Sequence, residues 1–146
     1  MNDMFTINAT DARKEWSLVI DNVVREKPQF ITRTRDCMVL SDIKLFENLL
    51  SAYEFTAYTY KEDDHSITIS LNEIDLAENA ETIDKAKMKL AEAIIEYAED
   101  FYSDFKYWST APNRAAYIPY VFKALIINDS RKIGDLIKCQ KSIQRE

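Results

Sequence analysis

Glycine is almost missing from this chain, which has a single one, Gly134, among 146 residues. Loops that cradle phosphate groups need several glycines, because their backbone must approach the ligand closely and adopt positive φ angles. The composition therefore excludes P-loop and dinucleotide-binding sites. Turns must rely instead on asparagine, aspartate and proline, the other residue types that suit turn geometry.

Histidine and cysteine are also scarce, with only His65, Cys37 and Cys139. The cysteines lie far apart without metal-ligand neighbours, so we expect buried, reduced thiols. A metal or acid–base role for His65 would need further ligands at fixed spacing, and its neighbours indicate a polar turn instead. No histidine accompanies a serine or cysteine as an activating base. We therefore predict a protein that is not an enzyme and has no metal or cofactor.

Long apolar runs are missing as well. No stretch approaches the roughly 18 apolar residues that a membrane span requires. The N-terminal segment has an early acid and no apolar region typical of a secretory signal. Hydrophobic residues nevertheless make up 47% of the chain, enough for a folded core. These features predict a globular cytoplasmic protein without a membrane partner.

The apolar spacing predicts an α+β fold, with an N-terminal β-α-β-β-α domain followed by a β-hairpin and three C-terminal helices. In the first domain, strands are expected at residues 4–8, 29–32 and 37–40. Thr10 or Asp11 should cap the first helix, which Pro28 stops and which carries Trp16 and Ile20 on its apolar face. Ser41 or Asp42 should cap the second helix. The domains are expected to span residues 1–54 and 55–146.

In the second domain, residues 57–60 and 66–71 are expected to form the hairpin, and residues 74–77 are a candidate for a third strand. Thr82 should cap a long helix whose apolar face extends to Phe105 and Trp108. A helix within 113–127 and a short one after Asp129 should follow, with a polar tail after Cys139. The aromatic residues of 101–122 are expected to be mostly core, with one or two left exposed in an interface.

Basic residues gather at two element ends in the first domain. Arg13 and Lys14 lie in the first turns of the first helix, and Arg33 and Arg35 lie at the tip of the hairpin. Arginine forks and helix N-terminal amides attract phosphates, and asparagine and arginine can bond base edges. This pattern is typical of a DNA-binding surface. The same residues would also be ordinary exposed turn and cap residues in a protein that binds no DNA.

Three short segments resemble the N-terminal domain of the Phd/YefM antitoxins of type II toxin–antitoxin systems. They are Ile7-Asn8-Ala9-Thr10-Asp11-Ala12-Arg13, Phe30-Ile31-Thr32-Arg33 and Val39-Leu40-Ser41. The resemblance covers residues 4–53. It implies a homodimer formed through the sheet, which binds operator DNA and represses its own operon. It also implies a cognate toxin, for which we expect a small basic ribonuclease.

By position, the resemblance implies DNA-binding roles for six residues. Asn8, Thr10 and Arg13 would face the DNA groove, Arg33 and Arg35 would hold phosphates, and Lys14 is a further candidate. The hairpin departs from the family pattern, because it lacks the usual glycine and places Asp36 beside the arginines. The alternative function is therefore a dimeric adaptor or structural protein of the same fold that no longer binds DNA. A neighbouring reading frame for a small basic ribonuclease would favour the antitoxin.

The net charge of −6 is spread unevenly. Residues 62–104 hold thirteen acids against three lysines, whereas residues 105–146 hold eight bases and three acids. Along the long helix, Glu92, Glu96 and Asp100 are expected to form a surface for a basic partner. A plain solvated helix face is the alternative. No histidine accompanies these carboxylates at metal-ligand spacing.

Overall fold

The protein is described by a computed structural model that covers residues 5–141. It divides into two compact units, Met1–Leu49 and Leu50–Glu146, and each has its own hydrophobic core. The expected α+β class is confirmed, since each unit combines a sheet with helices.

The N-terminal unit contains a three-stranded sheet in the order β1-β2-β3, with β1 parallel to β2 and β2 antiparallel to β3. Its elements are β1 (Thr6–Asn8), α1 (Ala9–Lys14), α2 (Trp16–Arg25), β2 (Gln29–Arg33), β3 (Asp36–Leu40) and α3 (Ile43–Leu50). One long helix was predicted between the first two strands. The structure instead ends α1 at Lys14 and starts α2 at Trp16, because Glu15 has non-helical angles of φ −115° and ψ 35°. Met4, which the first strand was expected to include, lies outside the described residues.

The cap of the first helix also differs from the prediction. Asn8 is the N-cap, two residues before the expected Thr10, and its side-chain oxygen accepts a hydrogen bond from the Asp11 backbone N–H at 2.9 Å. Asn8 has extended backbone angles, which allow its side chain to turn back to the first helical turn. The strand therefore passes directly into the helix with no intervening loop.

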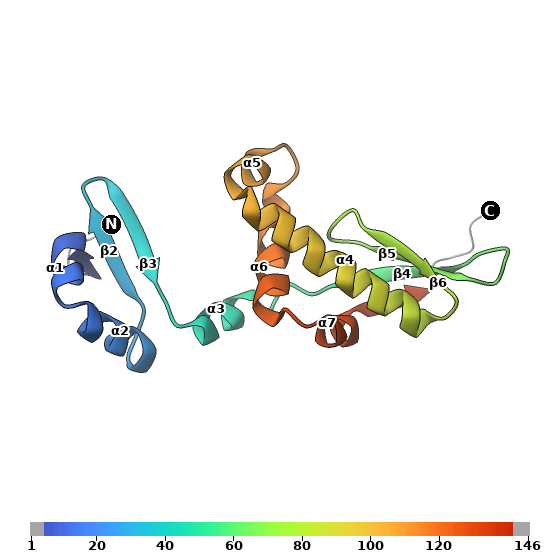
Figure 1. The fold of residues 1–146 in the computed structure, drawn as a ribbon, viewed down its shortest axis with the longest axis horizontal. Helices are drawn as coiled ribbons and strands as arrows, with labels where there is room; N and C mark the ends of the chain where they lie inside the picture. The colour runs from blue at the N-terminus through green and yellow to red at the C-terminus, as the bar shows by residue number, and fades with distance from the viewer. Residues whose placement is uncertain (1–4, 142–146) are drawn as a thin grey trace. The chain divides into compact units, whose positions relative to one another are not determined.

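The C-terminal unit has a four-stranded sheet in the order β6-β5-β4-β7. The strands are β4 (Thr56–Lys61), β5 (Ile67–Leu71), β6 (Ala77–Ala80) and β7 (Lys138–Lys141), of which β4 and β7 are parallel and the other pairs antiparallel. The helices are α4 (Ile83–Ser103), α5 (Phe105–Thr110), η2 (Ala115–Tyr117), α6 (Ile118–Ile127) and α7 (Ser130–Leu136). Figure 1 shows α4 running alongside β5 and β6, with α6 and α7 beside it.

The core of this unit lies between the sheet and α4. Ile69 and Leu71 alternate along β5, so they share one face of the sheet and are buried there with Leu90 and Ile94 of α4. The alternate residues belong to the opposite face, on which Tyr58 of β4 is 38% exposed. One face of the sheet thus carries the helices.

Several expectations for the C-terminal unit need correction. The predicted hairpin is confirmed as β4 and β5, and Thr82 and Asp129 do cap α4 and α7. The candidate third strand at 74–77 lies instead at Ala77–Ala80, and a fourth strand, β7, joins the sheet. The described residues of this unit contain four α-helices rather than three. The predicted long helix is broken at Asp104, whose φ of −131° is not helical, so Phe105 and Trp108 belong to α5.

The segment after α7 is not simply a polar tail. Lys138–Lys141 pairs with β4 as an edge strand, an arrangement that its mostly polar sequence, Lys-Cys-Gln-Lys, did not indicate. The reason is tertiary, because parallel pairing requires α4 to α7 to bring the chain back beside β4. Residues 142–146 lie outside the described part of the chain. No described helix combines the length and apolar character needed to cross a membrane.

Replacement of Leu90 by alanine should strongly destabilise the C-terminal unit. Leu90 has no exposed surface, so truncation leaves a cavity that costs about 2–5 kcal/mol. The matched control is Ile83→Ala in the first turn of the same helix, where the side chain is 40% exposed and the cost should stay within about 1 kcal/mol. Urea denaturation followed by circular dichroism measures both. Equal losses for the two variants would contradict the assignment of α4 to the core.

Candidate functional site

The basic hairpin tip of the N-terminal unit is exposed to solvent. Arg33 ends β2 and pairs in register with Asp36 of β3, and Thr34 and Arg35 form the turn between them. Neither arginine forms an ion pair with an acid among residues 5–141. Thr34 has a φ of 53°, in the left-handed region that favours glycine. The turn therefore presents two arginines whose guanidinium groups are available to a ligand.

The start of α1 lies at the same end of the sheet as this tip. The parallel pairing of β1 and β2 places Asn8 opposite Thr32, one residue before Arg33. Thr10 is exposed on the first turn of α1. The arginine pair thus lies at the hairpin tip as the sequence predicted, and the sheet register brings the start of α1 beside it. Arg13 and Lys14, which were expected in the first turns of a longer helix, lie instead in the last turn of the six-residue α1.

The local roles of these residues are also visible. Asn8 uses its side-chain oxygen for the cap, and its Nδ2 donates to Asp11 Oδ2 at 3.0 Å. Arg13 and Lys14 are exposed in the last turn of α1, where positive charge interacts favourably with the helix dipole. A contact between Asn8 and a base would therefore compete with its capping bonds, whereas Arg13 and Lys14 have no such competing bonds.

An apolar surface adjoins the basic end. A groove of about 600 Å³ is lined by Ala9, Ala12, Arg13, Trp16, Ile31, Met38, Val39 and Leu40. Trp16 is 47% exposed and Val39 is 58% exposed. A second groove, of about 380 Å³, shares Trp16 and Leu40 with the first and continues to Ile43. Trp16 and Ile20 thus remain exposed within the single chain, although the spacing assigned them to the apolar face of the first helix.

Strand β3 explains why sequence reasoning missed this surface. Residues of β3 from Asp36 to Val39 are exposed on both faces of the sheet, because β3 is an edge strand and α1 and α2 do not cover it. Cys37 is consequently exposed, and the expectation that both thiols are buried is wrong for this residue. Cys139 is half-buried, and burial raises the pKa of its thiol above the usual value.

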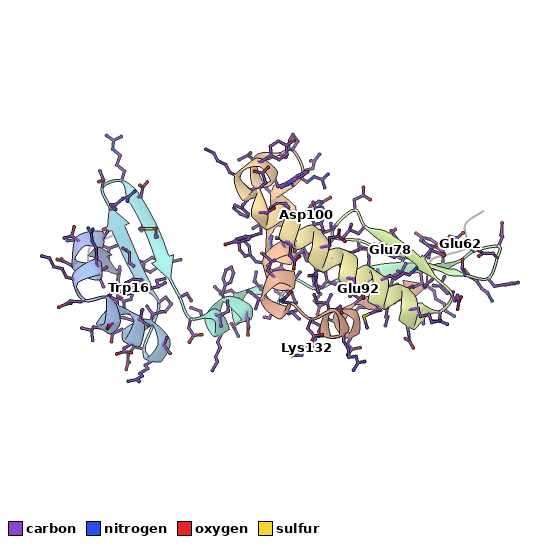
Figure 2. All side chains as sticks on the ribbon, viewed as in Figure 1. Trp16, Glu62, Glu78, Glu92, Asp100 and Lys132 are labelled. Atoms are coloured by element: carbon purple, nitrogen blue, oxygen red, sulfur yellow. The ribbon has the colours of Figure 1, made fainter. Side chains whose placement is uncertain are left out.

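In the C-terminal unit, the predicted carboxylates share the outer face of α4. Glu92, Glu96 and Asp100 follow each other at four-residue intervals, so they form one ridge along the helix, and Figure 2 shows Glu92 and Asp100 at two levels of it. All three are exposed, and none forms an ion pair among the described residues. Like charges at this spacing destabilise a helix by about 0.2–0.5 kcal/mol per pair. The ridge therefore carries a mutual repulsion that no ion pair within residues 5–141 relieves.

Aromatic residues cluster where α4 ends. Phe101 is buried, whereas Tyr102 is 59% exposed and Tyr107 is 61% exposed. The Tyr102 ring meets Phe122 of α6 edge-on, with centroids 6.3 Å apart, and Phe105 lies 5.7 Å from the same ring. The expectation of one or two exposed aromatics in this region is thus met by Tyr102 and Tyr107.

Arg114 is held in a nearby aromatic pocket. Its guanidinium lies 5.2 Å from the centre of the Tyr117 ring and 5.9 Å from that of Trp108, and Nη1 donates to the Tyr97 hydroxyl at 3.2 Å. Burial raises the pKa of Tyr97, and the charge of Arg114 partly opposes that shift. The chain therefore already stabilises one arginine by stacking on tyrosine.

Across residues 5–141, no group of three or more histidine, cysteine, aspartate or glutamate side chains is arranged to hold a metal ion. His65 lies in the exposed β4–β5 turn with a φ of 69°. It therefore occupies the polar turn that the sequence indicated.

Comparison with other proteins gives two matches. Residues 1–139 match a PHD-like family model described as antitoxin of toxin–antitoxin, RelE/RelB, TA system. The crystal structure of the antitoxin part of a proposed toxin/antitoxin system from Syntrophomonas wolfei subsp. wolfei is similar, with a TM-score of 0.89 and 34% identity. The similarity covers 94% of this chain and 99% of that one. No curated protein matches the chain at a significant level.

Proposed function

Because this chain belongs to the PHD-like family of antitoxins of toxin–antitoxin systems, we propose that it binds and neutralises a cognate toxin and represses its own operon as a DNA-binding homodimer. The C-terminal unit would bind the toxin, and residues 1–54 would form the dimer and contact DNA. The observation that supports this proposal is that each unit has a different kind of exposed surface. The N-terminal unit has exposed arginines and an apolar groove, and the C-terminal unit has an acidic ridge without ion pairs among the described residues.

A second copy of the chain is the proposed cover for the apolar groove. The N-terminal unit buries only Ala12, Val19, Val23 and Ile31 in its own core. A folding unit of about 50 residues buries a smaller share of its surface than a large domain does and is only marginally stable by itself. Trp16, Met38 and Val39 supply the additional apolar surface, and a twofold arrangement would cover the same groove on both copies.

DNA binding would follow from the dimer, since it presents two copies of the basic sheet end. Arg33 and Arg35 are proposed to hold phosphates, because their guanidinium groups are exposed and unpaired with acids of the described chain. Arg13, Thr10 and Asn8 are proposed to face the bases in a groove of the DNA, with Lys14 as a further phosphate contact. Twofold symmetry would then imply an operator of two related half-sites.

The toxin is proposed to be a small basic protein, a ribonuclease, that meets the ridge of Glu92, Glu96 and Asp100. A basic partner would replace the repulsion between these carboxylates with attraction, so that binding would also stabilise α4. The inner face of α4 already holds the helix in the fold, so three like charges on the outer face are not needed for stability. Binding of a basic partner would account for them.

A dimeric adaptor without DNA binding is the second candidate. The observation that favours it is Asp36, an exposed acid next to Arg35 at the hairpin tip. The net charge of −6 also opposes association with a polyanion. The adaptor would keep the apolar groove and the acidic ridge, so DNA titrations distinguish the two functions.

The first prediction concerns the dimer. Val39→Lys should convert a dimer into a monomer, because it places a charge in the apolar groove that the second copy covers. Ser17→Lys is the matched control, since Ser17 is exposed on α2 and does not line either groove. Sedimentation velocity at micromolar concentration measures both. A monomeric wild type would rule out the dimer.

The second prediction concerns DNA. Arg33→Ala and Arg35→Ala should weaken binding to all sequences alike and reduce the salt slope by about one. Arg13→Ala should instead erode the preference for the chain's own promoter, by roughly 1–3 kcal/mol for a lost base contact. Fluorescence anisotropy with promoter and random duplexes at several salt concentrations separates the two effects.

The control for this experiment is Asp36→Asn, which removes the neighbouring acid and should raise affinity if the arginines contact phosphates. Asn8→Ala should erode promoter preference too, but it also removes the α1 cap, so its stability must be measured in parallel. No preference of the wild type for its promoter at low salt would favour the adaptor.

The third prediction concerns the toxin, tested with the protein encoded by the reading frame adjoining this gene. The double variant Glu92→Lys/Asp100→Lys should associate more slowly and with weaker salt dependence. The variant should fold at least as well as the wild type, because Glu96 then has opposite charges four residues away on both sides. Asp75→Lys, an exposed acid between β5 and β6, is the control. Unchanged association rates would exclude the ridge from the interface.

A further inference from the structure

We propose that Tyr102 is an anchor residue for the toxin, and that an arginine of the toxin stacks on the exposed Tyr102 ring while it pairs with Glu99. This inference rests on the proposed function, in which a basic partner meets the outer face of α4. It adds a defined contact near the C-terminal end of α4, on the flank of the helix that carries Glu99.

The geometry that supports this contact comes from α4 and α6. Glu99 and Tyr102 are three residues apart on α4, so their side chains are neighbours on the helix surface. Tyr102 is 59% exposed, yet its ring is braced by the edge-on contact with Phe122. A braced aromatic ring loses little conformational freedom on binding, and tyrosines of this kind are enriched among the residues that dominate interface energy.

The charge around the ring selects an arginine as its occupant. Glu99 lies beside it, and Glu92, Glu96 and Asp100 continue along the same helix. A guanidinium can stack on an aromatic face and bond a carboxylate at the same time, because it is planar and carries donors along its edge. A lysine has a compact charge and cannot match both groups equally well.

The chain contains an intramolecular example of the same chemistry. Arg114 lies 5.2 Å from the Tyr117 ring centre while it donates to the Tyr97 hydroxyl. That pocket is already filled by the chain's own arginine. Tyr102 has an aromatic neighbour and an adjacent carboxylate, and more than half of its surface is open to solvent.

The test measures equilibrium binding of the full chain to the protein encoded by the adjoining reading frame, by calorimetry. Tyr102→Ala should weaken binding about tenfold or more, whereas Tyr102→Phe, which keeps the ring, should stay close to the wild type. Tyr58→Ala is the matched control, an exposed tyrosine on the sheet face opposite α4, and should leave binding unchanged. Thermal denaturation checks that Tyr102→Ala remains folded.

A double-mutant cycle identifies the arginine contact. Glu99→Gln should weaken binding, and its effect should largely disappear in the Tyr102→Ala background if both groups hold one guanidinium. Additive effects would contradict the shared arginine, and an equal loss in Tyr102→Phe and Tyr102→Ala would contradict stacking on the ring. Binding that Tyr102→Ala leaves intact overturns this inference alone, whereas no binding by the wild type overturns the proposed function.

Discussion

Burial of one face of α4 is the interaction on which the C-terminal unit depends. Leu90 and Ile94 have no exposed surface, and Phe101 is 1% exposed. Between them they contribute to a core shared with β5, β6, α6 and α7. Because this face fixes the helix, the opposite face is largely open to solvent, although Lys89 donates to the Asn79 carbonyl of β6. The unit can therefore carry a ridge of carboxylates whose mutual repulsion costs only tenths of a kcal/mol per pair, about an order of magnitude less than the core provides.

In the N-terminal unit, by contrast, few apolar side chains are buried and many are exposed. Its core consists of four side chains, of which Ala12 is the smallest, while larger apolar groups such as Trp16 and Val39 lie exposed. Its hairpin also holds Thr34 at a φ of 53°, where a β-branched residue stores roughly 1–3 kcal/mol of strain. A unit with so little core and a strained turn is expected to gain much of its stability from association. Its fold and its proposed dimerisation are then parts of one equilibrium.

The scarcity of glycine has a consequence across both units. Positive φ angles occur at Thr34, His65, Asn113 and Asn128 rather than at Gly134. Asparagine tolerates the left-handed region well, so the α6 C-cap at Asn128 and the turn at Asn113 are ordinary solutions. Thr34 is not, and it lies between the two arginines proposed to hold phosphates.

The sequence by itself determined the α+β class, the hairpin of β4 and β5, the caps at Thr82 and Asp129, and the antitoxin family, because these depend on local periodicity, capping residues and short motifs. It also placed Glu92, Glu96 and Asp100 on one helix, since four-residue spacing is sufficient for that. Only the tertiary structure decided that β7 returns to pair with β4, that α4 ends at Ser103, and that Trp16 and Cys37 are exposed. Local periodicity can indicate which residues share a face. Whether another element covers that face depends on contacts between residues distant in the chain.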